Sequence, residues 1–230
     1  MKCKIYLFRH GQTHFNLRKR FTGWMDADWT AKGKKNACIT AKKLKNKHIG
    51  VAFETSLIRS KHTLKEVLKF HPECRFVFRD DRMMERCYGD LQMHSHEAFI
   101  RKYGRDLFDK YHRAYDFPPP NGESVKIVEG RVDSFIKDLL AFIKKYKVNV
   151  AISAHGNSMR PFRRYFERVS YSQMMKWEMP YDDYFEYGVD VPSGPGEKLS
   201  RKSWNSVLLP SRVKLATDRK NVFKKYYSRA

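Results

Sequence analysis

Two histidine–glycine pairs are the residues of this chain best suited to carry out a reaction. His10-Gly11 follows the short apolar segment 4–8, and His155-Gly156 follows the segment 148–153, which is rich in β-branched residues. In sheets of parallel strands, reactive groups gather just past the carboxyl ends of the strands. Glycine at such a place lets the backbone turn sharply and lets a ligand come close. We therefore predict that both histidines belong to a functional site. For the single histidines we expect structural or surface roles, and these are His14, His48, His62 and His71.

Arg9 directly precedes His10, and this pairing indicates phosphoryl chemistry. A guanidinium group presents a planar fork of donors that matches the oxygens of a phosphoryl group. A neutral imidazole can attack phosphorus and form a covalent phosphohistidine. Such a reaction also needs further cations around the phosphoryl oxygens and an acid that protonates the leaving oxygen.

Alternating strands and helices are expected to hold these residues in place. The helix over 125–142 has the clearest apolar repeat, at intervals of three and four residues, and Thr30 is a candidate N-cap for an earlier helix. Further helices are expected up to about Phe70 and within residues 91–115. The expected strands are Lys4–Phe8, Ile49–Glu54, Arg75–Arg79 and Val148–Ser153. This alternation predicts an α/β fold, a three-layer αβα sandwich with a mostly parallel sheet.

The chain changes character beyond about residue 190. Residues 192–196 form a proline- and glycine-rich turn region, and residues 197–230 carry ten Lys and Arg against two Asp and Glu, a net charge of +8. We predict a catalytic domain over residues 1–190 and a basic C-terminal tail over residues 191–230. Because the segment 197–230 holds few apolar residues, we expect this tail to be solvated or loosely docked.

Composition excludes several classes of protein. The chain has 47 Lys and Arg against 25 Asp and Glu, and this net charge of +22 implies an anionic partner. No uncharged apolar run reaches the roughly 18 residues of a membrane span, and Arg9 interrupts the first apolar segment before a signal peptide could form. The four cysteines include no CxxC pair, which argues against a zinc site or a disulfide scaffold. We expect a cytoplasmic protein.

Several sequence blocks together resemble one enzyme family. Arg-His-Gly-Gln-Thr at 9–13 resembles the signature of the histidine phosphatase superfamily. The next blocks are similar to its cofactor-dependent phosphoglycerate mutase branch: Asn16, Arg-Phe-Thr-Gly-Trp-Met-Asp at 20–26, Thr-Ser-Leu-Ile-Arg at 55–59, Glu-Arg-Cys-Tyr-Gly at 85–89, Gly-Glu-Ser at 122–124 and Ala-His-Gly-Asn-Ser-Met-Arg at 154–160. The blocks come in the family's order over residues 4 to about 165.

The resemblance implies a role for each matching position. His10 is expected to be the nucleophile that becomes phosphorylated, and Glu85 the proton donor and acceptor for the substrate oxygen. The residues expected to cradle the phosphoryl group are Arg9, Arg59 and His155, helped by Asn16, Gly156 and Asn157. The residues expected to hold the carboxylate or second phosphate of the substrate are Thr22, Gly23, Arg86, Tyr88 and Arg113.

The function implied by the resemblance is that of a 2,3-bisphosphoglycerate-dependent phosphoglycerate mutase, an isomerase of glycolysis and gluconeogenesis. Such an enzyme interconverts 3-phosphoglycerate and 2-phosphoglycerate, uses 2,3-bisphosphoglycerate as primer and requires no metal. The partner we expect is therefore a small phosphorylated substrate. A homo-oligomer is left open, and binding of nucleic acid by the basic tail is a weaker alternative.

Two positions depart from the family pattern. His96 stands where the family usually has a lysine, and His112 stands where an arginine usually precedes Arg113. Histidines are largely neutral at pH 7, and each lost cation could weaken binding of a bisphosphate by about 1.5–3 kcal/mol. Residues 179–187 are acidic and aromatic where the family has a short threonine–glycine turn. The change at 179–187 indicates a different substrate pocket. The two neutral histidines favour hydrolysis, so the alternative is a histidine phosphatase that hydrolyses a small phosphate ester through the same His10.

Overall fold

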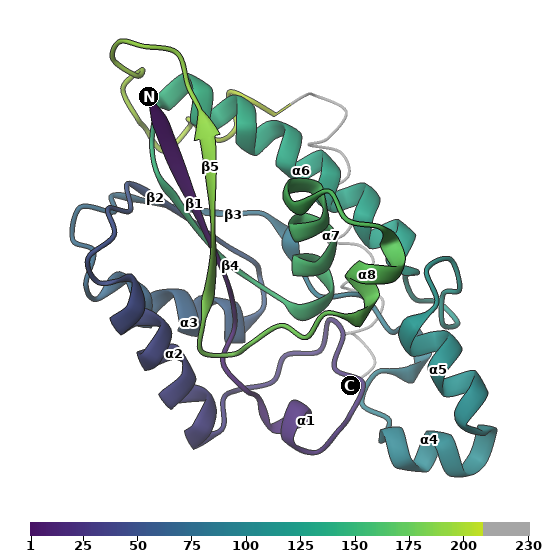
Figure 1. Ribbon diagram of the computed structural model, residues 1–230. Helices are drawn as coiled ribbons and strands as arrows, with labels where there is room; N and C mark the ends of the chain where they lie inside the picture. The colour runs from purple at the N-terminus through teal and green to yellow at the C-terminus, as the bar shows by residue number, and fades with distance from the viewer. Residues whose placement is uncertain (209–230) are drawn as a thin grey trace.

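A five-stranded sheet runs through the centre of the protein. The computed structural model describes residues 1–208 and has the strand order β3-β2-β4-β1-β5 (Figure 1). The four strands predicted from the sequence are parallel: β1 (Lys2–Arg9), β2 (Val51–Glu54), β3 (Phe76–Arg79) and β4 (Val150–Ala154). The sequence did not reveal β5 (Tyr184–Asp190), which runs antiparallel to β1 at the edge of the sheet.

Helices cover both faces of this sheet (Figure 1). α2 (Ala31–Leu44) and α3 (Ile58–Leu68) lie on one face, and α6 (Val125–Tyr146) and α7 (Gly156–Glu167) lie on the other. Successive side chains of a strand point to opposite faces, so Tyr6 and Phe8 of β1 pack with α2 and α3, whereas Ile5 and Leu7 pack with α6 and α7. The sheet therefore separates two apolar cores, and the predicted three-layer α/β fold is confirmed.

The remaining helices are short. They are α1 (His14–Leu17), the 3-10 helices η1 (Asp81–Met83) and η2 (Gly89–Leu91), α4 (His96–Tyr103), α5 (Arg105–Arg113) and α8 (Tyr171–Lys176). The predicted helical region 91–115 is divided between α4 and α5 by Gly104, whose φ of +86° is a conformation that favours glycine. Thr30 caps α2 as predicted, because its side chain accepts a hydrogen bond from the Gly33 amide. Within residues 1–208, no helix is long and apolar enough to cross a membrane.

The segment after β5 docks against the core. Trp204 is 3% exposed, and its ring contacts Phe53 and Phe142 while its Nε1 donates a hydrogen bond to Asp80. The expectation of a solvated or loosely docked tail is therefore wrong at Ser203 and Trp204, whereas most of residues 192–202 are exposed. Burial of one large apolar side chain stabilises the docked segment by about 1.5–3 kcal/mol. The lysines and arginines that precede Trp204 in the tail do not oppose this docking, because they are exposed to solvent. Residues 209–230 of the predicted tail lie outside the described residues, and the boundary at residue 190 stays a prediction.

Candidate active site

The two histidines singled out in the sequence meet at the carboxyl ends of adjacent strands. β1 and β4 are paired in parallel with Arg9 opposite Ala154, so His10 and His155 leave the sheet at the same level. The His10 amide donates a hydrogen bond to the Ala154 carbonyl. The two ring centroids are 5.0 Å apart, and both side chains are buried. The structure thus brings the two predicted residues together.

The surroundings of His10 define its chemical state. Its Nδ1 lies 2.8 Å from the Gly11 carbonyl oxygen, which can only accept, so Nδ1 carries the hydrogen and Nε2 keeps a lone pair. Burial lowers the pKa of His10 well below its ordinary value, and the charges of Arg59 and Arg9 lower it further. His10 is therefore a neutral imidazole with a free Nε2 lone pair, the form that can attack phosphorus.

His155 is neutral for similar reasons. Burial, followed by the charge of Arg59, holds its pKa well below the ordinary value. Its Nε2 and the Thr55 hydroxyl share a hydrogen bond of 2.9 Å. The side chain also lies at the start of α7, where it faces the backbone amide of Ser158. His155 therefore lies beside the nucleophile, fixed between Thr55 and the first turn of α7.

Glu85 places a carboxylate next to both histidines. Its Oε1 accepts hydrogen bonds from the amides of Arg86 (2.8 Å) and Asn157 (3.1 Å), and the latter belongs to the first turn of α7. A helix N-terminus favours a negative charge at this position. One side-chain nitrogen or oxygen from each of His10, Glu85 and His155 lies within 4.8 Å of the others. The structure therefore has an acid and a nucleophile side by side.

Two arginines place positive charge on this cluster. Arg59 donates hydrogen bonds to the Met25 and Gly23 carbonyls, each at 2.7 Å. Arg9 donates from Nη1 to the Met179 carbonyl at 2.9 Å, and its buried Nε has no partner among residues 1–208. Donors of this kind hold the oxygens of a phosphoryl group. The same charges would oppose a metal cation between His10, Glu85 and His155, and the expected lack of a metal requirement stays a prediction.

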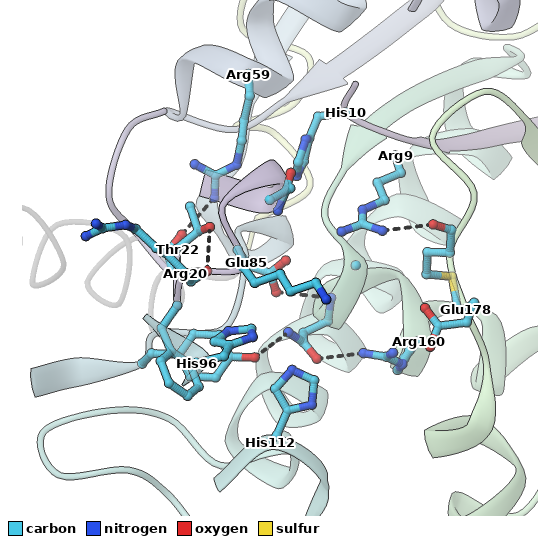
Figure 2. A pocket seen from close by; sticks show the side chains of 18 of the residues that line it. Arg9, His10, Arg20, Thr22, Arg59, Glu85, His96, His112, Arg160 and Glu178 are labelled. Atoms are coloured by element: carbon cyan, nitrogen blue, oxygen red, sulfur yellow. Dashed lines mark hydrogen bonds between the residues drawn. The ribbon is translucent and has the colours of Figure 1, made fainter. Parts of the chain in front are cut away.

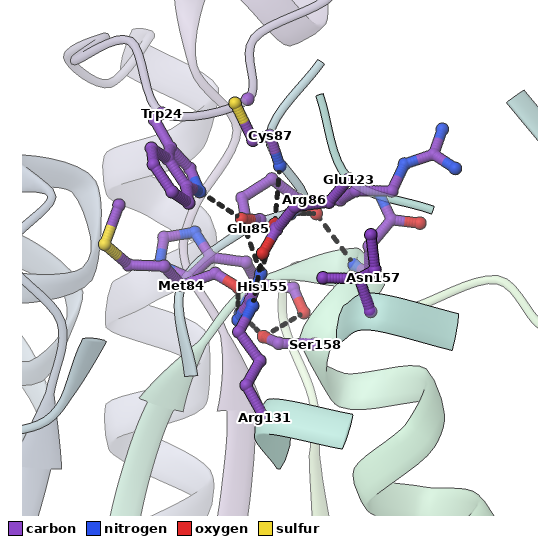
Figure 3. Close-up of polar contacts among 12 residues, drawn as sticks. Trp24, Met84, Glu85, Arg86, Cys87, Glu123, Arg131, His155, Asn157 and Ser158 are labelled. Atoms are coloured by element: carbon purple, nitrogen blue, oxygen red, sulfur yellow. Dashed lines mark hydrogen bonds and ion pairs between the residues drawn. The ribbon is translucent and has the colours of Figure 1, made fainter. Parts of the chain in front are cut away.

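A buried ion pair fixes the loop that carries Glu85 (Figure 3). Arg131 on α6 forms two hydrogen bonds with the Glu123 carboxylate, at 3.0 and 2.9 Å, and also donates to the backbone carbonyls of Arg82, Met84 and Glu85. Glu123 in turn accepts from the Cys87 amide, and Trp24 Nε1 donates to the Glu85 carbonyl at 2.8 Å. The backbone on both sides of Glu85 is therefore held from two directions.

Arg131→Met is expected to lower the free energy of unfolding by about 3–5 kcal/mol, because it leaves the Glu123 carboxylate buried beside an apolar side chain. Urea unfolding followed by circular dichroism measures this difference. The matched control is Arg105→Met, which removes an exposed pair with Asp109 and should change stability by less than about 1 kcal/mol. Equal losses of unfolding free energy in the two variants would contradict a stabilising role for the buried Arg131–Glu123 pair.

A cavity of about 230 Å³ opens beside this cluster (Figure 2). The predicted site residues that line it are Arg9, His10, Asn16, Thr22, Gly23, Arg59, Glu85, Tyr88, Arg113, Gly156 and Asn157. His155 contacts His10 but is not among the lining residues. Arg86 is not among them either: it is fully buried, donates to the Tyr111 carbonyl and packs over the Tyr88 ring. The predicted contact between Arg86 and the substrate therefore stays a prediction.

The sequence did not identify every residue of the cavity wall. The additional side chains include Lys19, Arg20, Arg160, Glu178 and Tyr181. A signal was available for Arg160, because it lies one helical turn after Gly156 and so shares its face of α7. Arg160 donates a hydrogen bond to the Asn157 side chain at 2.8 Å. Glu178 and Tyr181 reach the cavity only because the segment 177–183 crosses over it, which no local pattern reveals.

His96 and His112 also line the cavity, with ring centroids 5.7 Å apart (Figure 2). Burial, followed by the charge of Lys19, lowers the pKa of His96 to about 4. Burial, followed by the charges of Arg86 and Arg113, lowers the pKa of His112 to about 3. Both rings are therefore neutral at pH 7, as the sequence predicted, and neither supplies the cation that the family pattern has there.

Comparisons with known proteins agree with this geometry. A family model for the histidine phosphatase superfamily (branch 1) matches residues 5–189. A 2,3-bisphosphoglycerate-dependent phosphoglycerate mutase of Protochlamydia amoebophila is 30% identical over 204 residues, which cover 76% of this chain and 90% of the relative. A protein of the same name from Nitrobacter winogradskyi is 35% identical over 179 residues, covering 76% and 86%.

Solved structures show the same fold at lower identity. A mycobacterial glucosyl-3-phosphoglycerate phosphatase superposes with a TM-score of 0.71 at 19% identity, covering 81% of this chain and 90% of its own. The alpha-ribazole phosphatase from Shigella flexneri superposes with a TM-score of 0.70 at 18% identity, covering 86% and 99%. At these identities the likeness establishes a common fold only. The substrate has to be argued from the residues of the site.

Proposed function

The chain belongs to branch 1 of the histidine phosphatase superfamily, and from this premise we propose that it is a phosphoglycerate mutase that uses 2,3-bisphosphoglycerate as primer. One observation carries the proposal: in addition to Arg9 and Arg59 near His10, four more cationic side chains line the same cavity, namely Lys19, Arg20, Arg113 and Arg160. A single phosphate would leave most of these charges without an anion. A glycerate with two phosphates and a carboxylate would engage them. The names of the relatives at 30–35% identity also support it.

The residues present fit such a primer, because Arg9 lines the cavity beside His10 and its buried Nε has no partner among the described residues. Bisphosphoglycerate would supply the phosphoryl group that first loads His10. In the proposed mechanism, His10 Nε2 forms the bond to phosphorus while Arg9 and Arg59 hold the non-bridging oxygens.

Glu85 would move the proton in each direction. Its Oε1 is engaged by two backbone amides, so Oε2 is the atom expected to exchange a proton with the substrate oxygen. When the His10–phosphorus bond breaks and a substrate hydroxyl takes the phosphoryl group, Glu85 accepts the hydroxyl proton. When the other phosphate returns to His10, Glu85 gives that proton to the departing oxygen.

A phosphatase is the second candidate, and the neutral state of His96 and His112 favours it. Two positions that carry cations in the family pattern carry none here at pH 7. Glu178 adds a negative charge to the cavity wall, 3.5 Å from Arg113. Weaker retention of a bisphosphate would let water take the phosphoryl group from His10 before the second transfer.

Replacing His96 by Lys and His112 by Arg is expected to tighten binding of 2,3-bisphosphoglycerate about 10-fold for each added cation, because each supplies a charged hydrogen bond to the ligand. Isothermal titration calorimetry at pH 7 measures this. His48→Lys, an exposed position outside the cavity, adds charge without adding a contact and serves as the control. An affinity of the double variant equal to that of the control would contradict a second anion site at His96 and His112.

The function itself is tested by ³¹P NMR of the purified protein with 3-phosphoglycerate and a catalytic trace of 2,3-bisphosphoglycerate. Growth of the 2-phosphoglycerate signal without inorganic phosphate is the expected result. Inorganic phosphate alone would identify the phosphatase instead. If neither product forms, the proposal fails for this substrate, and other small phosphate esters become the candidates to test.

A further inference from the structure

The segment 177–183 covers the Arg9 side of the cavity. Met179 accepts the Arg9 hydrogen bond through its carbonyl, and the Tyr181 ring lies 3.9 Å from the Arg9 guanidinium carbon. The Tyr181 and His10 ring centroids are 6.3 Å apart, with the rings inclined at 61°. A Cβ atom on Gly156 would lie 3.5 Å from the same guanidinium. Arg9 is therefore packed against both Gly156 and Tyr181, next to the nucleophile.

This segment is anchored on both sides of Tyr181. Before it, the Trp177 carbonyl accepts two hydrogen bonds from Arg160, at 3.2 and 2.9 Å. After it, Asp183 forms an ion pair of 3.1 Å with Lys43 of α2, and β5 begins at the next residue. The Tyr181 ring is therefore held over Arg9 by contacts to two separate helices rather than by its own packing alone.

The ring has two physical effects at this place. An aromatic face attracts a guanidinium, so it fixes the plane in which Arg9 presents its donors. The same ring is an apolar, half-buried surface that lines the cavity beside His10. Water that attacks a phosphohistidine must approach phosphorus in line with the bond that breaks. Because the Tyr181 ring lines the cavity beside His10, it reduces the room for free water near phosphorus, whereas a bound substrate brings its own hydroxyl there.

We propose that Tyr181 decides the fate of the phosphoryl group on His10, favouring its transfer to a substrate hydroxyl over its hydrolysis. In the hydrolytic step that it suppresses, the water oxygen bonds to phosphorus, the bond to Nε2 breaks and its electron pair stays on Nε2. Glu85 takes the water proton. The inference rests on the proposed phosphohistidine, but not on which hydroxyl compound accepts the group. Residues 179–187 stand where the family pattern has a short turn. The proposed effect of Tyr181 is therefore a feature of this chain and not of the family pattern.

The test is a single-turnover measurement on the full chain. The enzyme is labelled with [³²P]2,3-bisphosphoglycerate and rapidly desalted, and loss of protein-bound label is then followed in buffer and with excess 3-phosphoglycerate. We expect Tyr181→Ala to lose label to water about 10-fold faster than the wild type, and Tyr181→Phe, which keeps the ring, to stay within about 2-fold. Tyr165→Ala, an exposed position near the end of α7, is the matched control and should match the wild type.

Each outcome of the label-loss experiment either supports or overturns the role of Tyr181. Equal decay in buffer for Tyr181→Ala and the wild type overturns the inference, and so does a Phe variant that behaves like the Ala variant. If Tyr181→Ala does not fold, Tyr181→Leu removes the aromatic face while keeping bulk, and it should lose label faster than Tyr181→Phe. A wild type that takes up no label overturns the proposed phosphohistidine itself, a result distinct from unchanged decay.

Discussion

His10→Ala is expected to lower turnover of 3-phosphoglycerate by about 10⁴-fold or more, because it removes the atom on which the phosphoryl group is carried. His155 is not expected to take over this role, since its Nε2 is engaged by the Thr55 hydroxyl and its ring is not among the cavity-lining residues. Coupled assays of 2-phosphoglycerate production at saturating 3-phosphoglycerate measure kcat directly.

The control for this substitution is His14→Ala, which removes an exposed histidine at the start of α1. Its turnover should stay within about 2-fold of the wild type, because a solvated ring outside the cavity stabilises no transition state. A His10→Ala protein that folds and keeps more than about one-hundredth of the wild-type rate would show that another group carries out the transfer.

Glu85→Gln is expected to lower turnover of 3-phosphoglycerate about 10²- to 10⁴-fold, the usual range for loss of a general acid or base. Glutamine keeps an oxygen to accept from the amides of Arg86 and Asn157, so the geometry of the loop should survive. Release of p-nitrophenolate from p-nitrophenyl phosphate in the first turnover should fall far less, because this leaving group needs no proton when His10 is phosphorylated. The ratio of the two rates therefore isolates proton transfer from binding.

Glu97→Gln, which removes an exposed carboxylate of α4, provides the comparison and should leave both rates unchanged. Equal losses on the two substrates in Glu85→Gln would indicate damage to the site rather than loss of a proton donor. If neither rate falls in Glu85→Gln, the proton donor is a residue other than Glu85.

The two arginines next to His10 act before and after phosphorylation. In the free enzyme, burial lowers the pKa of His10 and the charges of Arg59 and Arg9 lower it further, so the imidazole is unprotonated and nucleophilic. Once a phosphoryl group is attached, the same positive charges face its negative oxygens. A site that is electrostatically unfavourable for an imidazolium is therefore favourable for the phosphohistidine, and one pair of side chains achieves both.

Much of the site could be predicted from the sequence because it is built from local signals. His10 and His155 each follow a buried parallel strand, and the topology of such sheets brings strand ends together without knowledge of any contact. Glu85 was identified only through its motif, since an isolated loop carboxylate carries no structural signal. Its position depends on Arg131 and Glu123, which approach from α6 and from the turn before it.

Other features could not be predicted because they depend on packing between distant segments. β5 was missed because an antiparallel edge strand with exposed Glu186 does not show the continuous apolar run of the central strands. Trp204 was placed in a basic tail because composition averages over a segment, whereas one aromatic ring decides where that segment docks. Tyr181 looked like part of an acidic, aromatic loop until its contact with Arg9 was visible.

Direct detection of the phosphoenzyme tests the central claim most closely. The wild type is incubated briefly with [³²P]2,3-bisphosphoglycerate, denatured in alkali, digested and analysed by mass spectrometry for the labelled peptide. We expect an acid-labile, alkali-stable label on His10 that disappears on addition of 3-phosphoglycerate at a rate no slower than turnover. A label on another residue, or continued turnover with no labelled enzyme, would contradict the account.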